Sequence, residues 1–375
     1  MRILAIVYRL GGVYPTGVTN KRVLDALKSM GHEVLVISAP THTNTWHNEC
    51  HYECSDFPTS PARLFTKMGN FIQRDLNFIF WENRVFKCAK RIIKLFQPDI
   101  IYARSSPSAV CRVAARISKH TGIPVAMHFT DPIPAPIEWA SDLKYRSREI
   151  KLMETILPIA YKVSFGNKAM LEYQQSIMKY NFIDKSFISP DPSPSERFYY
   201  SKKIKNDVST LTFLGAFHGN RRPDSLFQAL YALNQSGYKC KLNIYDDNRY
   251  GINHPECVSF MGRTDNIQKT LLDSDILVDV EGEDNTPVFI SSKLKDYLCC
   301  GRPILAITVK NSPSYNLVNG LSTVKCCENK PSEIVSAIKS VLDIDFREED
   351  YKERLVIIKQ FNPTFLAKLI TDEFK

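Results

Sequence analysis

Short apolar runs rich in β-branched residues alternate with helix-periodic stretches along most of this 375-residue chain. In the first half, apolar residues recur at helical spacing between Val23 and Met30, and Thr19 is predicted to cap that helix. The strands expected in this half are residues 2–8, 34–38, 99–104, 123–129 and 162–166. Because strands of this length separated by helices favour a parallel sheet covered on both faces, we expect a doubly wound α/β protein.

The alternation breaks once, at residues 188–207, where three prolines, several serines and a charged tail indicate an exposed linker. Further strands are then expected at 210–215, 240–246, 257–260, 275–280 and 302–308. We therefore expect two Rossmann-like domains, residues 1–188 and 208–358, with a linker at 189–207 and an amphipathic helix at 359–375. The domains are expected to face each other across a cleft, and open parallel sheets bind ligands at the carboxyl ends of their strands.

Composition indicates an ordinary soluble globular protein with an uneven charge. Hydrophobic residues make up 44% and charged residues 24%, which excludes a disordered, collagen-like or coiled-coil chain. The net charge of +9 lies in residues 1–200, which hold 26 basic and 17 acidic side chains, whereas residues 201–375 hold 23 of each. The apolar run at 3–8 is too short for a signal-peptide core, so the ten cysteines are expected to be reduced thiols in a cytoplasmic protein.

One cluster has the side chains of a metal site. His47, Cys50, His51 and Cys54 lie within the segment WHNECHYEC, and all four side-chain types bind zinc. Their spacing matches no metal module, and a polar loop between a strand and a helix is the alternative. The sequence leaves the two interpretations open.

The segment FLGAFHGNRRPDSLFQAL, residues 213–230, combines a glycine-bearing loop with a basic helix start. A strand is expected to end at Leu214, Gly215 opens the loop, and Pro223 follows Arg221 and Arg222 where the first helical turn tolerates proline. Two guanidinium groups beside free backbone N–H groups make an anion site. The alternative is a solvated arginine pair before a proline-initiated helix.

The segment FISSKLKDYLCCGRPILAI, residues 289–307, contains a second candidate anion site. Ser291 and Ser292 lie at an expected helix N-terminus, where N–H groups attract phosphate, and Lys293 adds a cation. Asp296 lies one helical turn further on, where its carboxylate can accept hydrogen bonds from a diol such as ribose. Alternatively, Lys293 is a surface lysine and Asp296 is a solvated acid on the face of the helix.

Together, these two segments resemble the nucleotide-sugar-binding domain of GT-B glycosyltransferases, most closely glycosyltransferase family 4. The family pattern S-K-x-x-E-Y-x-x-x-G-x-P-I/V is similar to SKLKDYLCCGRPI at 292–304, and the first segment keeps a glycine, an arginine and a proline. The likeness extends to the first domain through Gly11 and Gly12, through GHEVLVIS and through GIPVAMHFTDP at 122–132. The C-terminal helix resembles the one that crosses back to the first domain, so the likeness covers nearly the whole chain.

The resemblance implies a role for each motif. Arg222, together with Arg221, and Lys293 would hold the donor diphosphate. The backbone at residues 291–292 would assist them, and Asp296 would bind the ribose hydroxyls. In the first domain, Gly11 and Gly12 would let a loop approach the donor, and His128 would lie near the transferred sugar.

Two positions depart from the family pattern. The family often has two glutamates eight positions apart; Asp296 stands for the second, but Val288 occupies the position of the first. Ala216 stands where an arginine commonly follows the first glycine of the loop. Glu281 and Glu283 lie close enough for a shifted loop to restore a carboxylate. The departures therefore affect the contacts to the sugar more than those to the diphosphate.

The expected mechanism follows from the leaving group. Negative charge builds on the departing diphosphate, and Arg222 and Lys293 are suited to stabilise it without a metal or cofactor. Family 4 enzymes retain the anomeric configuration; if this enzyme inverts, Asp131 or His128 becomes the candidate base. The alternative for His128 is a buried core histidine with hydrogen-bond partners.

Residues 61–97 hold eight basic and two acidic side chains interleaved with large aromatic residues. This pattern on helices suits an anionic membrane surface, whereas no nucleic-acid recognition module is visible. An aromatic core with a solvated lysine face is the alternative.

The sequence thus predicts a metal-independent hexosyltransferase that uses a UDP- or GDP-sugar. Its acceptor would be a glycan or a lipid-linked sugar in cell-surface polysaccharide assembly, and the enzyme would lie in the cytoplasm or peripherally on the inner face of the membrane. Rival predictions are a sugar-nucleotide epimerase, a sugar phosphorylase and a non-catalytic binding protein on the same scaffold.

Overall fold

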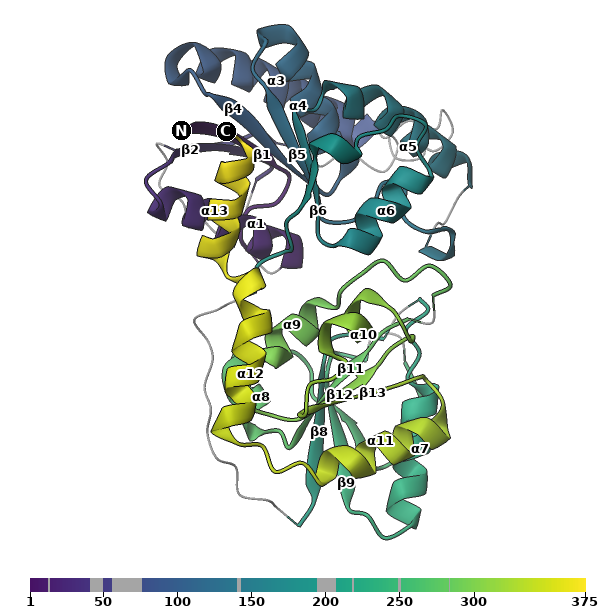
Figure 1. Cartoon of the computed structure of the whole chain (residues 1–375). Helices are drawn as coiled ribbons and strands as arrows, with labels where there is room; N and C mark the ends of the chain where they lie inside the picture. The colour runs from purple at the N-terminus through teal and green to yellow at the C-terminus, as the bar shows by residue number, and fades with distance from the viewer. Residues whose placement is uncertain are drawn as a thin grey trace. The chain divides into compact units, whose positions relative to one another are not determined.

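The computed structural model describes residues 1–12, 14–40, 50–55, 76–139, 143–193, 207–217, 219–248, 251–282 and 284–375. It divides into two compact units, Met1–Pro192 with Pro363–Lys375, and Ser193–Asn362. Most of the predicted linker at 189–207 lies outside the described residues. In Figure 1 the first unit runs from purple to teal and includes the final yellow helix, and the second unit runs from green to yellow.

The first unit is built on a parallel sheet of seven strands in the order β3-β2-β1-β4-β5-β6-β7. Its strands are β1 (Arg2–Val7), β2 (Glu33–Ser38), β3 (His51–Glu53), β4 (Ile100–Ser105), β5 (Val125–Phe129), β6 (Lys162–Phe165) and β7 (Ser186–Ile188). Its helices are α1 (Pro15–Ser29), α3 (Leu76–Phe96), α4 (Ser108–Thr121), α5 (Leu143–Ile156), α6 (Lys168–Ser176) and α13 (Pro363–Glu373), with 3-10 turns η1 (Ile137–Trp139), η2 (Leu157–Ile159) and η3 (Ile183–Lys185).

The prediction that Thr19 caps the first helix is wrong. Helix α1 begins at Pro15 with Tyr14 as its N-cap, and the Thr19 hydroxyl donates to the Thr16 carbonyl inside the helix. Proline fits the first helical position because it needs no N–H partner there, so the helix starts one turn earlier than the cap residue suggested.

The C-terminal helix completes the core of the first unit. Helix α13 packs beside α1 (Figure 1), and the ring of Phe374 lies 5.4 Å from that of the buried Tyr102. The Lys162 ammonium also pairs with the Glu373 carboxylate at 2.8 Å. The chain therefore returns to its first sheet at its end.

The second unit is built on a parallel sheet of six strands in the order β10-β9-β8-β11-β12-β13. Its strands are β8 (Ser209–Leu214), β9 (Cys240–Tyr245), β10 (Val258–Phe260), β11 (Ile276–Val280), β12 (Ile304–Ile307) and β13 (Val324–Cys327). Its helices are α7 (Asp224–Gln235), α8 (Ile267–Asp273), α9 (Ser292–Leu298), α10 (Pro313–Val318), α11 (Pro331–Leu342) and α12 (Glu348–Ile358), followed by the 3-10 turn η4 (Lys359–Phe361).

Each face of the second sheet is buried under helices. Leu211 and Phe213 lie in one core cluster together with residues of α7 and α11, and Leu277 and Ile304 lie in another with residues of α9. Both sheets are parallel and flanked by helices, which confirms the predicted doubly wound α/β class. In the second sheet the strand order reverses between β8 and β11, the position where such sheets bind ligands. Across the described residues, no helix is long and apolar enough to cross a membrane.

Candidate functional site

A glycine turn and a lysine meet at the carboxyl end of β8. Gly215 follows the strand with φ of +129°, a backbone conformation that side chains with a Cβ rarely adopt. A Cβ placed on Gly215 would lie 2.4 Å from Lys293 Cε, and Lys293 Nζ lies 5.0 Å from the centroid of the Phe213 ring. Only glycine at position 215 therefore lets the Lys293 side chain lie across the end of the strand.

Lys293 lies in an enclosed place that holds charges of both signs. Its side chain keeps some exposed surface, but burial of the ammonium group, together with the nearby Arg221, lowers its pKa to about 8. The carboxylates of Asp279 and Glu281 oppose this shift. Without a bound anion, part of the Lys293 population is therefore neutral near physiological pH.

The structure separates the two arginines of the first motif. Arg221 is half-buried near Lys293, and its Nε atom is buried without a hydrogen bond to any described residue. Arg222 is 70% exposed and pairs with Asp224 at 3.2 Å. Helix α7 begins at Asp224 with Pro223 as N-cap, as the proline position suggested. The arginine that accompanies Lys293 in this structure is therefore Arg221.

Of the two predicted serines, Ser291 is held by hydrogen bonds inside the second unit. The Ser291 hydroxyl caps α9 by accepting from Leu294 N and donates to Asp279 Oδ1 at 2.8 Å. Ser291 N donates to the Ser314 hydroxyl at 3.1 Å, so this N–H is already used inside the unit. Ser292 is exposed at the first position of the helix, and Asp296 is half-buried one turn along it.

A buried acidic network lies beside Lys293; it joins Glu281, which the sequence analysis considered, to Asp279, which it did not. The Glu281 carboxylate accepts hydrogen bonds from the Thr308 and Ser314 hydroxyls, and Asp279 is 1% exposed. Burial and the nearby Asp279 raise the pKa of Glu281 to about 7, against the effect of its two hydrogen bonds and of Arg221. Asp279 gave no signal because it stands alone in the apolar strand segment DILVDV.

A cavity of about 260 Å³ opens at the carboxyl ends of β11, β12 and β13. It is lined by Glu281, Gly282, Asp284, Asn285, Ile307, Thr308, Val309, Glu328, Asn329 and Lys330. Asp284 also accepts a hydrogen bond from Asn220 Nδ2 at 3.0 Å, which ties the cavity wall to the loop after β8. Val288 is buried, and Glu283 lies outside the described residues. Three carboxylates, those of Glu281, Asp284 and Glu328, thus line the cavity.

In the first unit, the predicted glycines form a tight loop before α1. Gly11 and Gly12 have φ of +68° and +76°. Gly11 N donates to Gly17 O at 2.7 Å, and a Cβ on Gly17 would lie 2.1 Å from Gly11 O. Gly17, which the sequence analysis did not single out, therefore holds this loop against the first turn of α1.

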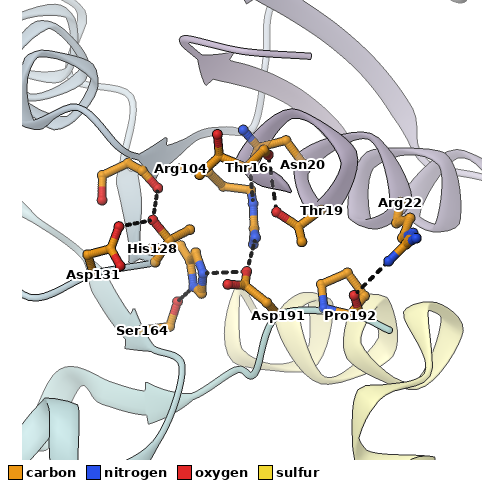
Figure 2. Close-up of polar contacts among 12 residues, drawn as sticks. Thr16, Thr19, Asn20, Arg22, Arg104, His128, Asp131, Ser164, Asp191 and Pro192 are labelled. Atoms are coloured by element: carbon orange, nitrogen blue, oxygen red, sulfur yellow. Dashed lines mark hydrogen bonds and ion pairs between the residues drawn. The ribbon is translucent and has the colours of Figure 1, made fainter. Parts of the chain in front are cut away.

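A buried charged network joins residues of α1, β4 and β5 (Figure 2). Arg104, at the end of β4, is 0% exposed and donates to Asn20 Oδ1 at 2.9 Å and to the Tyr102 hydroxyl at 2.8 Å. Its third contact is an ion pair with Asp191 Oδ1 at 3.0 Å. The ion pair and hydrogen bonds compensate the cost of burying the guanidinium.

His128 belongs to the same network. Its ring is fully buried; Nδ1 lies 3.0 Å from the Ser164 hydroxyl, and Nε2 lies 3.6 Å from Asp191 Oδ1. This placement favours the interpretation as a core histidine over that as a base in contact with a sugar.

Asp131, two residues after β5, is exposed and accepts a hydrogen bond from the Thr130 hydroxyl at 3.4 Å. Desolvation by surrounding protein, together with the charge of Asp191, raises its pKa to about 6. Because the side chain is exposed, solvent screens part of this effect.

The candidate zinc cluster is only partly described, because His47 lies outside the described residues. His51 Nε2 lies 2.8 Å from the Ser38 hydroxyl, Cys50 packs against the core, and Cys54 lies close to Cys88. Within the described ranges, no group of three or more His, Cys, Asp or Glu side chains could hold a metal ion.

No protein-family model and no curated protein matches the chain, whereas solved structures do. The glycosyltransferase of Rickettsia africae ESF-5 is 16% identical, with a TM-score of 0.71 and a match that covers 100% of this chain and 97% of that one. TarM is 11% identical, with a TM-score of 0.70 and coverage of 100% and 98%. The UDP-GlcNAc 2-epimerase of Neisseria meningitidis, bound to UDP-GlcNAc, is 9% identical, with a TM-score of 0.57 and coverage of 100% and 99%.

The chain has the GT-B fold. At these identities the similarity establishes the fold alone, and it confirms the prediction of two Rossmann-like domains.

Proposed function

We propose that the protein is a glycosyltransferase that binds a nucleoside-diphosphate sugar in the Ser193–Asn362 unit. The observation that carries this proposal is the meeting of Arg221 and Lys293 beside the Gly215 turn. One cation has a buried nitrogen without a described partner, and the other has a lowered pKa. Asp279 and Glu281 offset part of this positive charge, and a diphosphate would add further negative charge and acceptor oxygens for both cations.

The rest of the donor fits the surroundings of this cation pair. Asp296, one turn beyond Lys293 on α9, would accept hydrogen bonds from the ribose hydroxyls. Glu281, Asp284 and Asn285 line the cavity at the ends of β11–β13 and offer acceptors and an amide to a hexose. Because structures with this fold have been solved with UDP and with UDP-GlcNAc, a UDP-sugar is the first donor to test and a GDP-sugar the second.

The proposed mechanism uses charge that is already in place. As the sugar departs, negative charge accumulates on the diphosphate, and Arg221 and Lys293 stabilise it without rearrangement and without a metal. Arg222 joins them only if it leaves Asp224. We infer retention of configuration with help from the leaving phosphate. For an inverting reaction Asp131 is the better base, because it is exposed and its pKa is raised toward neutral pH.

The acceptor side is proposed from the surface of helix α3. Its exposed side chains include five cations, and its one acidic residue, Glu82, is buried and pairs with Arg112. The exposed cations, named here the α3 basic face, are Arg84, Lys87, Lys90, Arg91 and Lys94. Each such contact with an anionic membrane contributes about 1 kcal/mol. The face therefore supports a lipid-linked acceptor in polysaccharide assembly at the inner membrane surface; residues 61–75 of the predicted basic segment lie outside the described residues.

The proposal is tested by donor turnover. Purified full-length protein is incubated with UDP- and GDP-hexoses and with a pool of lipid-linked and glycan acceptors, and release of nucleoside diphosphate is measured with and without EDTA. We expect acceptor-dependent release that EDTA leaves unchanged. Lys293→Ala should reduce it at least tenfold, whereas Lys241→Ala, which removes an exposed lysine on β9, should leave it unchanged. If no sugar nucleotide is consumed under any condition, the enzyme proposal is wrong.

The second candidate is a sugar-nucleotide epimerase, because the Neisseria meningitidis epimerase shares the fold over the whole chain. The same assay separates the two reactions. An epimerase changes or hydrolyses the sugar nucleotide without an acceptor, whereas a transferase releases nucleoside diphosphate in proportion to acceptor.

A further inference from the structure

Cys54, which follows strand β3, lies close to Cys88 of helix α3. Cys54 directly follows β3, is 7% exposed, and has its backbone N–H hydrogen-bonded to the Ser38 carbonyl of β2 at 2.8 Å. Cys88 lies in the middle of α3 and is partly exposed. The two thiols lie close enough for each to affect the pKa of the other.

A second set of contacts holds these segments together. Arg84, one helical turn before Cys88, donates from Nη1 to both the carbonyl and the hydroxyl of Ser55, each at 2.7 Å. Ser55 is the neighbour of Cys54, so the guanidinium fixes the Cys54 segment against α3. Because the hydrogen bond to Ser38 holds the Cys54 backbone against β2, the Cys54 segment is fixed on one side by the sheet and on the other by α3.

The surroundings make one of the two thiols the better nucleophile. The hydrogen bond from Cys54, and then the nearby Arg91, lower the pKa of Cys88, while burial opposes them. The pKa of Cys54 is raised, first by its hydrogen bond with Cys88 and then by burial. In contrast, burial raises the pKa of Cys111, Cys240, Cys257, Cys299, Cys300, Cys326 and Cys327. Reactive cysteines lie in electropositive, partly exposed places, which describes Cys88.

We propose that Cys54 and Cys88 form a redox-active dithiol, in which peroxide oxidises Cys88 and Cys54 closes a disulfide that joins the end of β3 to helix α3. Both cysteines lie in the first unit, and neither takes part in the proposed donor site. The proposal therefore stands or fails independently of the glycosyltransferase activity.

The reaction balances with hydrogen peroxide as the oxidant. The Cys88 thiolate attacks one peroxide oxygen, the O–O bond breaks, and hydroxide leaves and is protonated, which gives a sulfenic acid and one water. The Cys54 sulfur then attacks the Cys88 sulfur, the S–O bond breaks, and the hydroxide leaves with the Cys54 proton as a second water. The two thiols have then lost two electrons to the peroxide, and a dithiol reductant reverses the reaction.

The test is peptide mapping of the full-length protein after limited hydrogen peroxide and alkylation of the remaining thiols. Trypsin cuts after Lys87 and Lys90, so we expect the short Cys88 peptide joined to the peptide that ends at Arg63, and separated from it by dithiothreitol. The second peptide also carries Cys50, so Cys50→Ser should keep the link and Cys54→Ser should abolish it. In Cys54→Ser, the Cys88 sulfenic acid should persist long enough to react with dimedone.

Two controls compare the reactivity of Cys88 with that of other cysteines and with that of Cys88 in an Arg91 variant. Cys240 begins β9 and Cys257 directly precedes the neighbouring strand β10; because the pKa of both is raised, they should stay reduced at the same peroxide dose. Iodoacetamide at neutral pH should modify Cys88 about tenfold faster than Cys240, and Arg91→Gln should slow the reaction of Cys88. The proposal is overturned if the Cys88 peptide stays unlinked and fully alkylated, if Cys88 links to Cys50 instead, or if Cys88 reacts no faster than Cys240.

Discussion

Replacing Gly215 by alanine perturbs the proposed donor site through the backbone rather than through a charge. The new Cβ would lie 2.4 Å from Lys293 Cε, and φ of +129° would be strained in alanine, so the lysine must move. Loss of one charged hydrogen bond to the diphosphate costs about 1.5–3 kcal/mol, which is about a 10- to 100-fold weaker nucleotide affinity. Isothermal titration of the variant with UDP and GDP measures this loss.

Gly219 supplies the matched control for this experiment. It lies in the same loop with φ of +59°, and a Cβ there would have no heavy atom within 4 Å. Gly219→Ala therefore adds backbone strain of about 1 kcal/mol without displacing Lys293, so it should lower the melting temperature but keep nucleotide affinity. In a double-mutant cycle, Gly215→Ala should add little to Lys293→Ala. Unchanged affinity in Gly215→Ala, or equal losses in both glycine variants, would refute the assignment of Lys293.

Three further predictions follow from buried charges. Because the pKa of Lys293 is about 8 without ligand and an anion stabilises its charged form, UDP affinity should fall as pH rises above about 8, and titrations in buffers of different ionisation enthalpy should show proton uptake on binding. Asp191→Ala leaves Arg104 buried without its counter-ion and should lower the free energy of unfolding by about 3 kcal/mol in urea titrations, whereas Asp184→Ala, on the surface, should change it by less than about 0.5 kcal/mol. The pKa of Glu281 is about 7 in the folded protein and 4.5 in the unfolded chain. The contribution of its protonated form to the free energy of unfolding is therefore complete below pH 4.5 and is lost as pH rises to about 7. In urea titrations at different pH, Glu281→Gln should reduce the change in the free energy of unfolding over this pH range.

The strands of both sheets were largely predictable because their side chains are buried on both faces. Runs such as Ile3–Val7 and Ile304–Ile307 are continuously apolar, as is typical of parallel strands. The short strands β3, β7 and β13 were not predicted. They have three or four residues and are partly exposed, so they lack the apolar run that marks the others.

The candidate site was only partly predictable, because side-chain direction depends on the turn and not on the motif. The motif contains both Arg221 and Arg222, but in the fold the charge of the first acts on Lys293 and the second pairs with Asp224 at the surface. Arg104 was missed because a single cation within the apolar strand IIYARS gives no periodic signal. Its partner Asp191 lies 87 positions away in the sequence, so only the fold brings the two together.

The central claim is that Arg221 and Lys293 hold the diphosphate of a nucleotide donor. Isothermal titration of UDP and GDP, each against the matching monophosphate, into the wild type, Arg221→Ala and Arg222→Ala tests it most directly. We expect the wild type to bind one diphosphate at least tenfold more tightly than its monophosphate. Arg221→Ala should remove this difference, whereas Arg222→Ala should largely keep it. Equal affinity for the diphosphate and the monophosphate, or an unchanged preference in Arg221→Ala, would contradict it.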